Sequence, residues 1–259
     1  MKIEGAVVVI TGAGSGIGAA LARRCRVGDA EQVIVCDIDG DAAKRVAGVF
    51  GGVPEALDVS DANAVKDLIE RTVARYGRID LFCSNAGIVS EGGLETSDAT
   101  WSRMFDVNVM AHVFAARAVV PHMLEHGRGH ILITASAAGL LSAPGDAAYT
   151  VTKHAAVGFA EWLSITHGDD GIGVSVLCPM GVATPMFRKS RAHGHLSTGV
   201  VAASGTVVTP EYVTDVVIDA LRDERFLILP QPEVATFWSR KTSDPERWLA
   251  GMRRLVSRL

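Results

Sequence analysis

Tyr149 and Lys153 are the two side chains whose types and spacing most directly suggest proton transfer. On a helix, residues four apart lie on one face, so the phenol and the ammonium would be neighbours. The ordinary pKa of tyrosine is about 10, and a fixed ammonium lowers that pKa because it stabilises the phenolate. We therefore expect Tyr149 to act as an acid and a base with Lys153 beside it.

A glycine-rich turn, TGAGSGIG at 11–18, follows the first apolar run of the chain. Glycines permit a tight turn, let the backbone approach a pyrophosphate, and allow the next helix to pack closely. The N-terminus of that helix offers free N–H groups and a favourable dipole to phosphates. The turn predicts a dinucleotide site. Its expected contacts are Gly12, Ser15, Gly16, Ile17 and Gly18.

Asp37 stands about 20 residues beyond the last glycine of the turn, where a ribose-binding carboxylate is expected. A carboxylate there can accept hydrogen bonds from the adenosine ribose hydroxyls, but it repels the 2′-phosphate of NADP. The nearest downstream cation is Lys44, inside the next predicted helix. Asp37, with Ile38 beside it, therefore favours NAD as the cofactor.

Short apolar runs alternate with longer helical patterns along the whole chain. The predicted strands are 6–10, 32–36, 53–57, 79–83, 130–134, 173–178 and 226–229, and the longer predicted helices are 61–76, 101–126 and 147–167. Continuous apolar runs suit strands that are covered on both faces of a parallel sheet. We expect an α/β fold with a doubly wound, parallel, seven-stranded sheet of the Rossmann type and helices on both faces. Asp61 and Asp98 are expected N-caps.

No linker or internal repeat divides the chain, so we expect residues 1–259 to form one catalytic domain. The segment 186–209 breaks the strand–helix rhythm because it is long and rich in Gly, Ser and Ala. Long irregular segments in compact domains are often lids or binding loops. We expect this segment to cover a substrate at the carboxyl edge of the sheet.

Composition excludes several other classes of protein. The formal charge of −4 gives no basic footprint for nucleic acid. No stretch approaches the ~18 apolar residues of a membrane span. The four cysteines are widely spaced, which suits a reducing cytoplasm. His193 and His195 have no third ligand nearby in the sequence, so we expect no metal.

Two further polar residues make the Tyr–Lys pair specific: Ser136 follows the fifth predicted strand, and Asn108 lies in the preceding long helix. With them, the sequence resembles the short-chain dehydrogenase/reductase family, of the NAD type, over nearly the whole chain through Leu229. The matching pieces are TGAGSGIG, the acid of CDID, LDVSD, NAG at 85–87, VNV around Asn108, Ser136 and YTVTK.

The resemblance implies a role for each of these residues. Tyr149 would be the general acid and base, and Ser136 would hydrogen-bond the substrate oxygen. Lys153 would hold the nicotinamide ribose, and Asn108 would hold a water that links Lys153 to solvent. The remaining implied cofactor contacts are Asp58 and Val59 at the adenine, Asn85, Ala86 and Gly87 along the ribose and backbone, and Pro179, Gly181, Val182 and Thr184 at the nicotinamide.

The sequence departs from the family pattern at two places in the expected site. Ser84 replaces an asparagine that commonly precedes Asn-Ala-Gly. Met180 stands where the family usually has a glycine, which leaves the geometry of that turn open.

The implied reaction is hydride transfer between NAD(H) and a secondary alcohol or ketone. One alternative is an extended relative that acts as a sugar-nucleotide epimerase or dehydratase, although only about 30 residues follow the last predicted strand. A second is an enoyl reductase, whose tyrosine and lysine are spaced more widely. A third is a non-catalytic NAD-binding sensor, which would not need the Asn-Ser-Tyr-Lys set.

The residues expected around the substrate are mainly apolar. They are Leu140, Leu141, Met180, Met186, Phe187 and Trp238. Only Arg188, Lys189 and Arg191 offer positive charge within reach, on the segment 186–209. We expect an apolar substrate that is uncharged or singly charged. The helices 101–126 and 147–167 would form the interface of a homodimer or homotetramer.

Overall fold

The structure, a computed structural model, describes all 259 residues. Its core is one seven-stranded sheet in the order β3-β2-β1-β4-β5-β6-β7, and every neighbouring pair of strands is parallel. The strands are β1 (Val7–Thr11), β2 (Gln32–Asp37), β3 (Val53–Ala56), β4 (Leu81–Ser84), β5 (Gly129–Thr134), β6 (Ile172–Leu177) and β7 (Leu227–Ile228). The predicted seven-stranded doubly wound sheet is confirmed.

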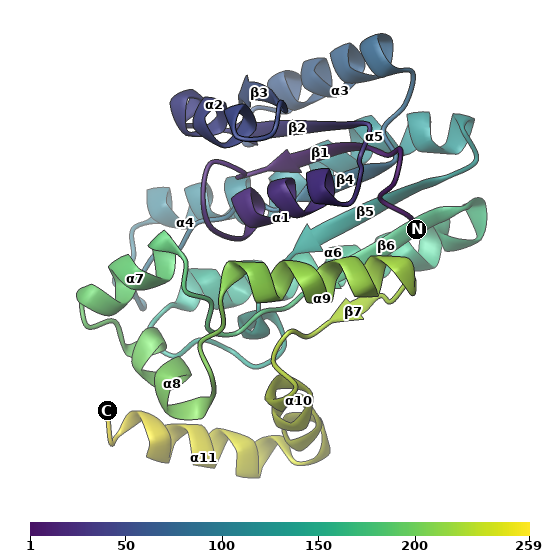
Figure 1. The fold of residues 1–259 in the computed structure, drawn as a ribbon. Coiled ribbons are helices and arrows are strands. Elements are labelled where there is room, and N and C mark those ends of the chain that lie inside the picture. The colour runs from purple at the N-terminus through teal and green to yellow at the C-terminus, as the bar shows by residue number, and fades with distance from the viewer.

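Helices cover both faces of this sheet, as the sequence predicts (Figure 1). The helices are α1 (Gly16–Val27), α2 (Gly40–Gly48), α3 (Ala62–Tyr76), α4 (Asp98–Phe105), α5 (Ala111–Glu125), α6 (Ala147–His167), α7 (Pro185–Ala192), α8 (Leu196–Ser204), α9 (Pro210–Arg222), α10 (Glu233–Ser243) and α11 (Pro245–Val256). Strand side chains alternate between faces: Val7 and Val9 pack with α3, α5 and α6, whereas Val8 and Ile10 pack with α1, α2 and α9.

Of the two predicted N-cap residues, Asp61 and Asp98, only Asp61 caps a helix. Asp61 caps α3, and its carboxylate accepts hydrogen bonds from the backbone N–H groups of Asn63 and Ala64. The cap of α4 is Ser97, whose hydroxyl accepts from the N–H of Thr100, so the prediction of Asp98 as N-cap is wrong. Asp98 is instead the first helical residue, where a carboxylate also suits the helix dipole.

The predicted helix 101–126 is one rod with an irregular centre. A five-residue π-helical turn, Asp106–Met110, joins α4 to α5 and carries Asn108. The whole segment, Asp98–Glu125, is the one helix long and apolar enough to cross a membrane by length and composition. It lies against the sheet, where Val107, Val119 and Met123 join the core on that face.

Most of the segment 186–209 lies in the helices α7 and α8, so the expectation of an irregular segment is wrong for that part, while 205–209 are not helical. Thr184 caps α7 through a hydrogen bond from the N–H of Phe187, and Pro185 occupies the first turn. Gly194, with a φ of 70°, turns the chain between α7 and α8. A side-chain cap thus begins α7, whereas α8 begins after His195 without one, and two helices stand where composition alone indicates a loop.

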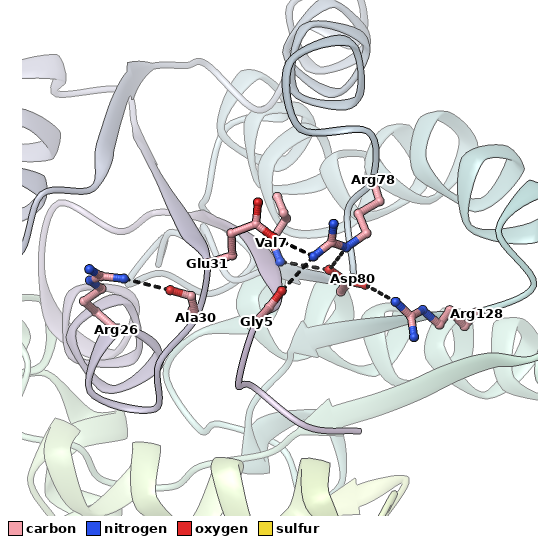
Figure 2. Close-up of polar contacts among 8 residues, drawn as sticks. All are labelled: Gly5, Val7, Arg26, Ala30, Glu31, Arg78, Asp80 and Arg128. Carbon is pink, nitrogen blue, oxygen red and sulfur yellow. Dashed lines mark hydrogen bonds and ion pairs between the residues drawn. The ribbon is translucent and has the colours of Figure 1, made fainter.

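Asp80 joins several strands at the amino edge of the sheet (Figure 2). Its carboxylate accepts hydrogen bonds from the N–H of Val7 at 2.9 Å and from Arg78 Nε at 2.9 Å, and it pairs with Arg128 at 3.6 Å. Arg78 also donates to the carbonyl of Gly5 and to Glu31. One carboxylate therefore fixes the beginnings of β1, β4 and β5 together.

We expect Asp80→Ala to lower the free energy of unfolding by about 2–4 kcal/mol, because it leaves the buried Val7 N–H without an acceptor and Arg78 with fewer partners. Urea unfolding measures this loss. The matched control is Asp215→Ala, whose ion pair with Arg24 is exposed, so its cost should be below about 1 kcal/mol. Equal losses in the two variants would contradict the assignment.

Candidate active site

A cavity of about 600 Å³ opens where β1, β2, β5 and β6 end. Among the residues that line it are most of those expected from the sequence: Gly12, Ser15, Gly16, Ile17, Asp37, Ile38, Asp58, Val59, Asn85, Ala86, Gly87, Ser136, Tyr149, Lys153, Pro179, Val182 and Thr184. Three expected residues, Asn108, Gly18 and Gly181, do not line the cavity. Each of them lies next to a residue that does: Asn108 hydrogen-bonds Ile88, Gly18 packs against Gly12, and Gly181 packs against Val201.

The glycine-rich turn packs too closely for side chains. A Cβ on Gly12, whose φ is 63°, would lie 2.7 Å from Cα of Ala86, and one on Gly18 would lie 2.4 Å from the carbonyl oxygen of Gly12. Ser15 is the N-cap of α1 but its hydroxyl makes no capping hydrogen bond. The first N–H groups of α1 are therefore available to a ligand at the cavity.

Asp37 is held at the end of β2 by backbone donors. Its carboxylate accepts from the N–H of Gly14 at 2.8 Å and from the N–H of Asp39 at 3.0 Å. This arrangement fixes a negative charge at the cavity beside the glycine-rich turn.

Asp58 and Asn85 shape the wall on either side of the turn. The Asp58 carboxylate accepts from Ser60 and pairs with Arg103 at 3.5 Å, and Arg103 also lines the cavity. The Asn85 amide donates to the carbonyls of Thr11 and Gly12, so it ties β4 to the turn. The sequence did not single out Arg103, because it lies on α4, far along the chain from Asp58.

Ser136, Tyr149 and Lys153 all line the cavity, and the Ser136 hydroxyl neighbours the Tyr149 phenol. Lys153 Nζ lies 5.7 Å from the centre of the Tyr149 ring, and it donates a hydrogen bond to the carbonyl of Thr134 at 3.0 Å. Ser136 follows β5 and directs its hydroxyl toward the carbonyl of Pro179 at 3.4 Å. Gly87 leaves room for the Lys153 ammonium, since a Cβ on Gly87 would lie 3.3 Å from Lys153 Nζ.

Asn108 is fully buried behind Lys153 in the π-helical turn. Its amide exchanges hydrogen bonds with the backbone of Ile88 at 2.9 Å in both directions and donates to Thr152 Oγ1 at 3.1 Å. These bonds occupy the side chain and join α6 to the loop after β4. π-Helical turns are often found at functional sites.

Burial dominates the pKa values of the central pair. It raises the pKa of the Tyr149 phenol, while the neighbouring Ser136 hydroxyl opposes that rise. Burial also lowers the pKa of Lys153 to about 8. The expected lowering of the Tyr149 pKa by Lys153 stays a prediction for the site with its cofactor bound, because burial is the dominant influence on this phenol in the protein by itself.

Asp146, three residues before Tyr149, is a buried carboxylate that the sequence reading did not select. It caps α6 by accepting from the N–H of Tyr149, and it also accepts from the Ser90 hydroxyl and from the N–H groups of Ser90 and Glu91. One side chain therefore holds both the catalytic helix and the loop after β4. An aspartate just before a helix is an N-cap signal that could have found it.

The outer walls of the cavity are mainly apolar, but they differ in part from those expected. Leu141, Met180, Met186 and Phe187 line the cavity, whereas Leu140 does not. Trp238 was expected in the wall and is absent from it, because Phe237, one residue earlier, faces the cavity instead. Three residues of α11 complete the wall: Trp248, Met252 and Leu255.

Met180 and Gly181 form a turn that Gln231 holds from behind. The buried Gln231 amide accepts from the N–H of Met180 at 3.0 Å and donates to the carbonyl of Gly181 at 2.7 Å. Met180 does not require the left-handed conformation that would favour glycine. The open question about this turn is resolved: Met180 fits, and its side chain joins the cavity wall.

Ser84, the first departure from the family pattern, pairs with the buried His112. The Ser84 hydroxyl lies 2.7 Å from His112 Nδ1, and His112 Nε2 has no partner in the protein. Burial, with help from the charge of Lys153, lowers the pKa of His112 to about 3 from an ordinary value of 6.5. The imidazole therefore stays neutral in the folded protein.

This histidine should make the protein sensitive to acid. Between its two pKa values the unfolded chain binds a proton that the folded chain does not, so stability falls as the pH falls. Lowering the pH from 7 to 5 should cost about 2 kcal/mol through His112. We expect His112→Leu combined with Ser84→Ala to remove that loss, measured by urea unfolding at both pH values. Parallel losses in parent and variant would contradict it.

Comparison with known proteins now identifies the family. The model of the short chain dehydrogenase family matches residues 6–194, and the chain belongs to this family. A 1-deoxy-11-beta-hydroxypentalenate dehydrogenase of Streptomyces avermitilis is 35% identical over 259 residues, covering 96% of this chain and 93% of that protein. A meso-2,3-butanediol dehydrogenase of Serratia marcescens is 36% identical over 193 residues, covering 72% and 75%.

A solved structure supports the same assignment. A short chain dehydrogenase/reductase from Burkholderia phymatum, crystallised with NAD, superposes with a TM-score of 0.87 at 29% identity, covering 95% of this chain and 96% of that one.

Proposed function

We propose that this protein is an NAD-dependent dehydrogenase that interconverts a secondary alcohol and a ketone. The observation that carries the proposal is the convergence of Ser136, Tyr149 and Lys153 on one cavity, whose other end holds the free N-terminus of α1 and Asp37. Relatives named as dehydrogenases of hydroxylated compounds support the reaction class.

The residues present fit a nicotinamide dinucleotide. The unused N–H groups at the start of α1 would hold the pyrophosphate, and Asp37 would accept hydrogen bonds from the adenosine ribose hydroxyls. The walls at Asp58 and Val59 would border the adenine, and those at Val182 and Thr184 the nicotinamide. When bound, NAD accepts the hydride and brings a positive charge to the site.

Residues of the protein would transfer the proton. Ser136 would orient the substrate oxygen, and the Tyr149 phenol would exchange the proton at that oxygen. The pKa of Tyr149, which burial raises, would fall as positive charge enters the site beside it. Lys153, held by the carbonyl of Thr134, would carry the proton onward, and Asn108 would keep the turn around Lys153 in place.

The test is turnover of a panel of secondary alcohols with NAD, followed by the absorbance of NADH. We expect activity on apolar alcohols, because the outer walls are apolar. Binding of NAD without turnover of any alcohol or ketone would favour the sensor alternative.

We also infer a homodimer or homotetramer in the cytoplasm. Exposed apolar side chains on the two long helices support an interface between copies: Phe105 and Leu124 on the α4–α5 rod, and Val151, Trp162 and Ile165 on α6. Four buried cysteines without disulfides agree with a reducing compartment. Light scattering of the purified protein tests the oligomeric state.

A further inference from the structure

Arg240 is a cation in the cavity wall that has no partner. It lies on α10, three residues after Phe237, and both residues line the cavity. Residues three apart on a helix share a face, so α10 presents an aromatic ring and a guanidinium to the same space. Unlike the other charged residues of this wall, Arg240 makes no side-chain hydrogen bond or ion pair.

The other cations of the cavity are already engaged. Arg103 is bound to Ser60 at 2.6 Å and Asp58 at 3.5 Å, at the end of the cavity near Val59. Lys153 is bound to the carbonyl of Thr134. Arg188, one of the cations expected from the sequence, is outside the cavity wall and donates to the carbonyl of Ala183.

Two acids that line the cavity, Glu91 and Asp146, are satisfied as well. Glu91 pairs with His195 at 3.3 Å, across from the turn between α7 and α8. Asp146 accepts hydrogen bonds from Ser90, Glu91 and Tyr149. Neither acid pairs with Arg240, so the guanidinium charge remains available to a ligand.

The surroundings of Arg240 are apolar. Trp248, Met252 and Leu255 stand at positions i, i+4 and i+7 of α11 and line the cavity, so this helix turns its apolar face toward the ligand space. Val200 and Val201 of α8 lie in the same wall. A ligand that fits these walls would have an apolar body and, at Arg240, one negative charge.

We propose that Arg240 selects a carboxylate on an otherwise apolar alcohol or ketone substrate. The inference rests on the proposed function and names its substrate class more closely. Arginine presents two parallel N–H donors that match the two oxygens of a carboxylate. With one unpaired guanidinium in a mainly apolar wall, the site matches a ligand that carries a single negative charge.

The test measures binding rather than turnover, so it can fail independently of the proposed reaction. Decanoate and decanamide have the same chain length and differ in charge. Isothermal titration of each into the NADH-loaded protein should give about tenfold tighter binding of decanoate, a modest factor because Arg240 is exposed to water. Arg240→Gln should abolish this preference, and Arg240→Lys should keep part of it.

Arg253→Gln is the matched control, because Arg253 is an exposed cation one residue after Met252 and does not line the cavity. It should retain the full preference for decanoate. A parent protein that binds both probes equally, or neither, overturns the proposal, and so does a preference that survives in Arg240→Gln. Decanoate selectivity lost only in the Arg240 variants supports it, even if no alcohol were turned over.

Discussion

Tyr149→Phe should lower the turnover of an alcohol by about 10²–10⁴-fold and leave the affinity for NAD nearly unchanged. The phenylalanine ring fills the same space but has no proton to exchange with the substrate oxygen. Ser136 remains to orient the substrate, so KM should change much less than kcat. Steady-state kinetics and titration with NADH together measure both effects.

Tyr212→Phe is the matched control for this experiment. Tyr212 is half exposed on α9 and donates to the carbonyl of Pro230, away from the cavity wall. Its loss of a hydroxyl should leave kcat unchanged. Near-parental turnover in Tyr149→Phe would remove the phenol from the reaction and point to another acid and base.

Asp37 should give a preference for NAD over NADP of at least ~10²-fold in kcat/KM. At ~4 Å a carboxylate and a phosphate repel by ~1–4 kcal/mol, depending on screening. Lost hydrogen bonds to the ribose hydroxyls add ~1.5–3 kcal/mol. Asp37→Ala should relax the preference, measured by kcat/KM with each cofactor.

Two further variants separate charge from structure. Asp37→Asn keeps an acceptor for the N–H of Gly14 but removes the charge, so it should relax the preference with less loss of stability. Asp41→Ala removes an exposed acid that pairs with Lys44, and cofactor choice should not change. Equal efficiency with NADP in the parent enzyme would show that Asp37 does not govern the choice.

The sheet and the dinucleotide site could be predicted because their signals are local. The apolar run of β1, the glycine-rich turn and Asp37 occur in a fixed order with fixed spacing, and the sheet register brings them together. Tyr149 and Lys153 share one helix, so their neighbourhood follows from helical geometry alone.

The substrate wall could not be predicted because it depends on packing between distant segments. α8 and α11 are separated by 40 residues of sequence, yet both line the cavity. Local periodicity predicts an apolar face on α11 but not what that face meets. The prediction of Trp238 in the wall failed for the same reason, since it required the rotation of α10 about its axis, which places Phe237 there instead.

The π-helical turn at Asn108 is a second feature that could not be predicted from the sequence. The pattern of 101–126 reads as a continuous helix, and nothing in it reveals one wider turn. The pKa of Tyr149 is a third case: the sequence places an ammonium nearby, but the burial that raises this pKa exists only in the folded protein.

The position of Asp146 links two processes that are usually considered separately. Its carboxylate binds the backbone of Ser90 and Glu91 at the cavity wall and the first turn of the helix that carries Tyr149. Any ligand that orders the wall therefore also stabilises the start of that helix, and thermodynamic reciprocity requires the converse. We therefore expect substrate binding at this wall and the position of the Tyr149 phenol to be coupled through one carboxylate.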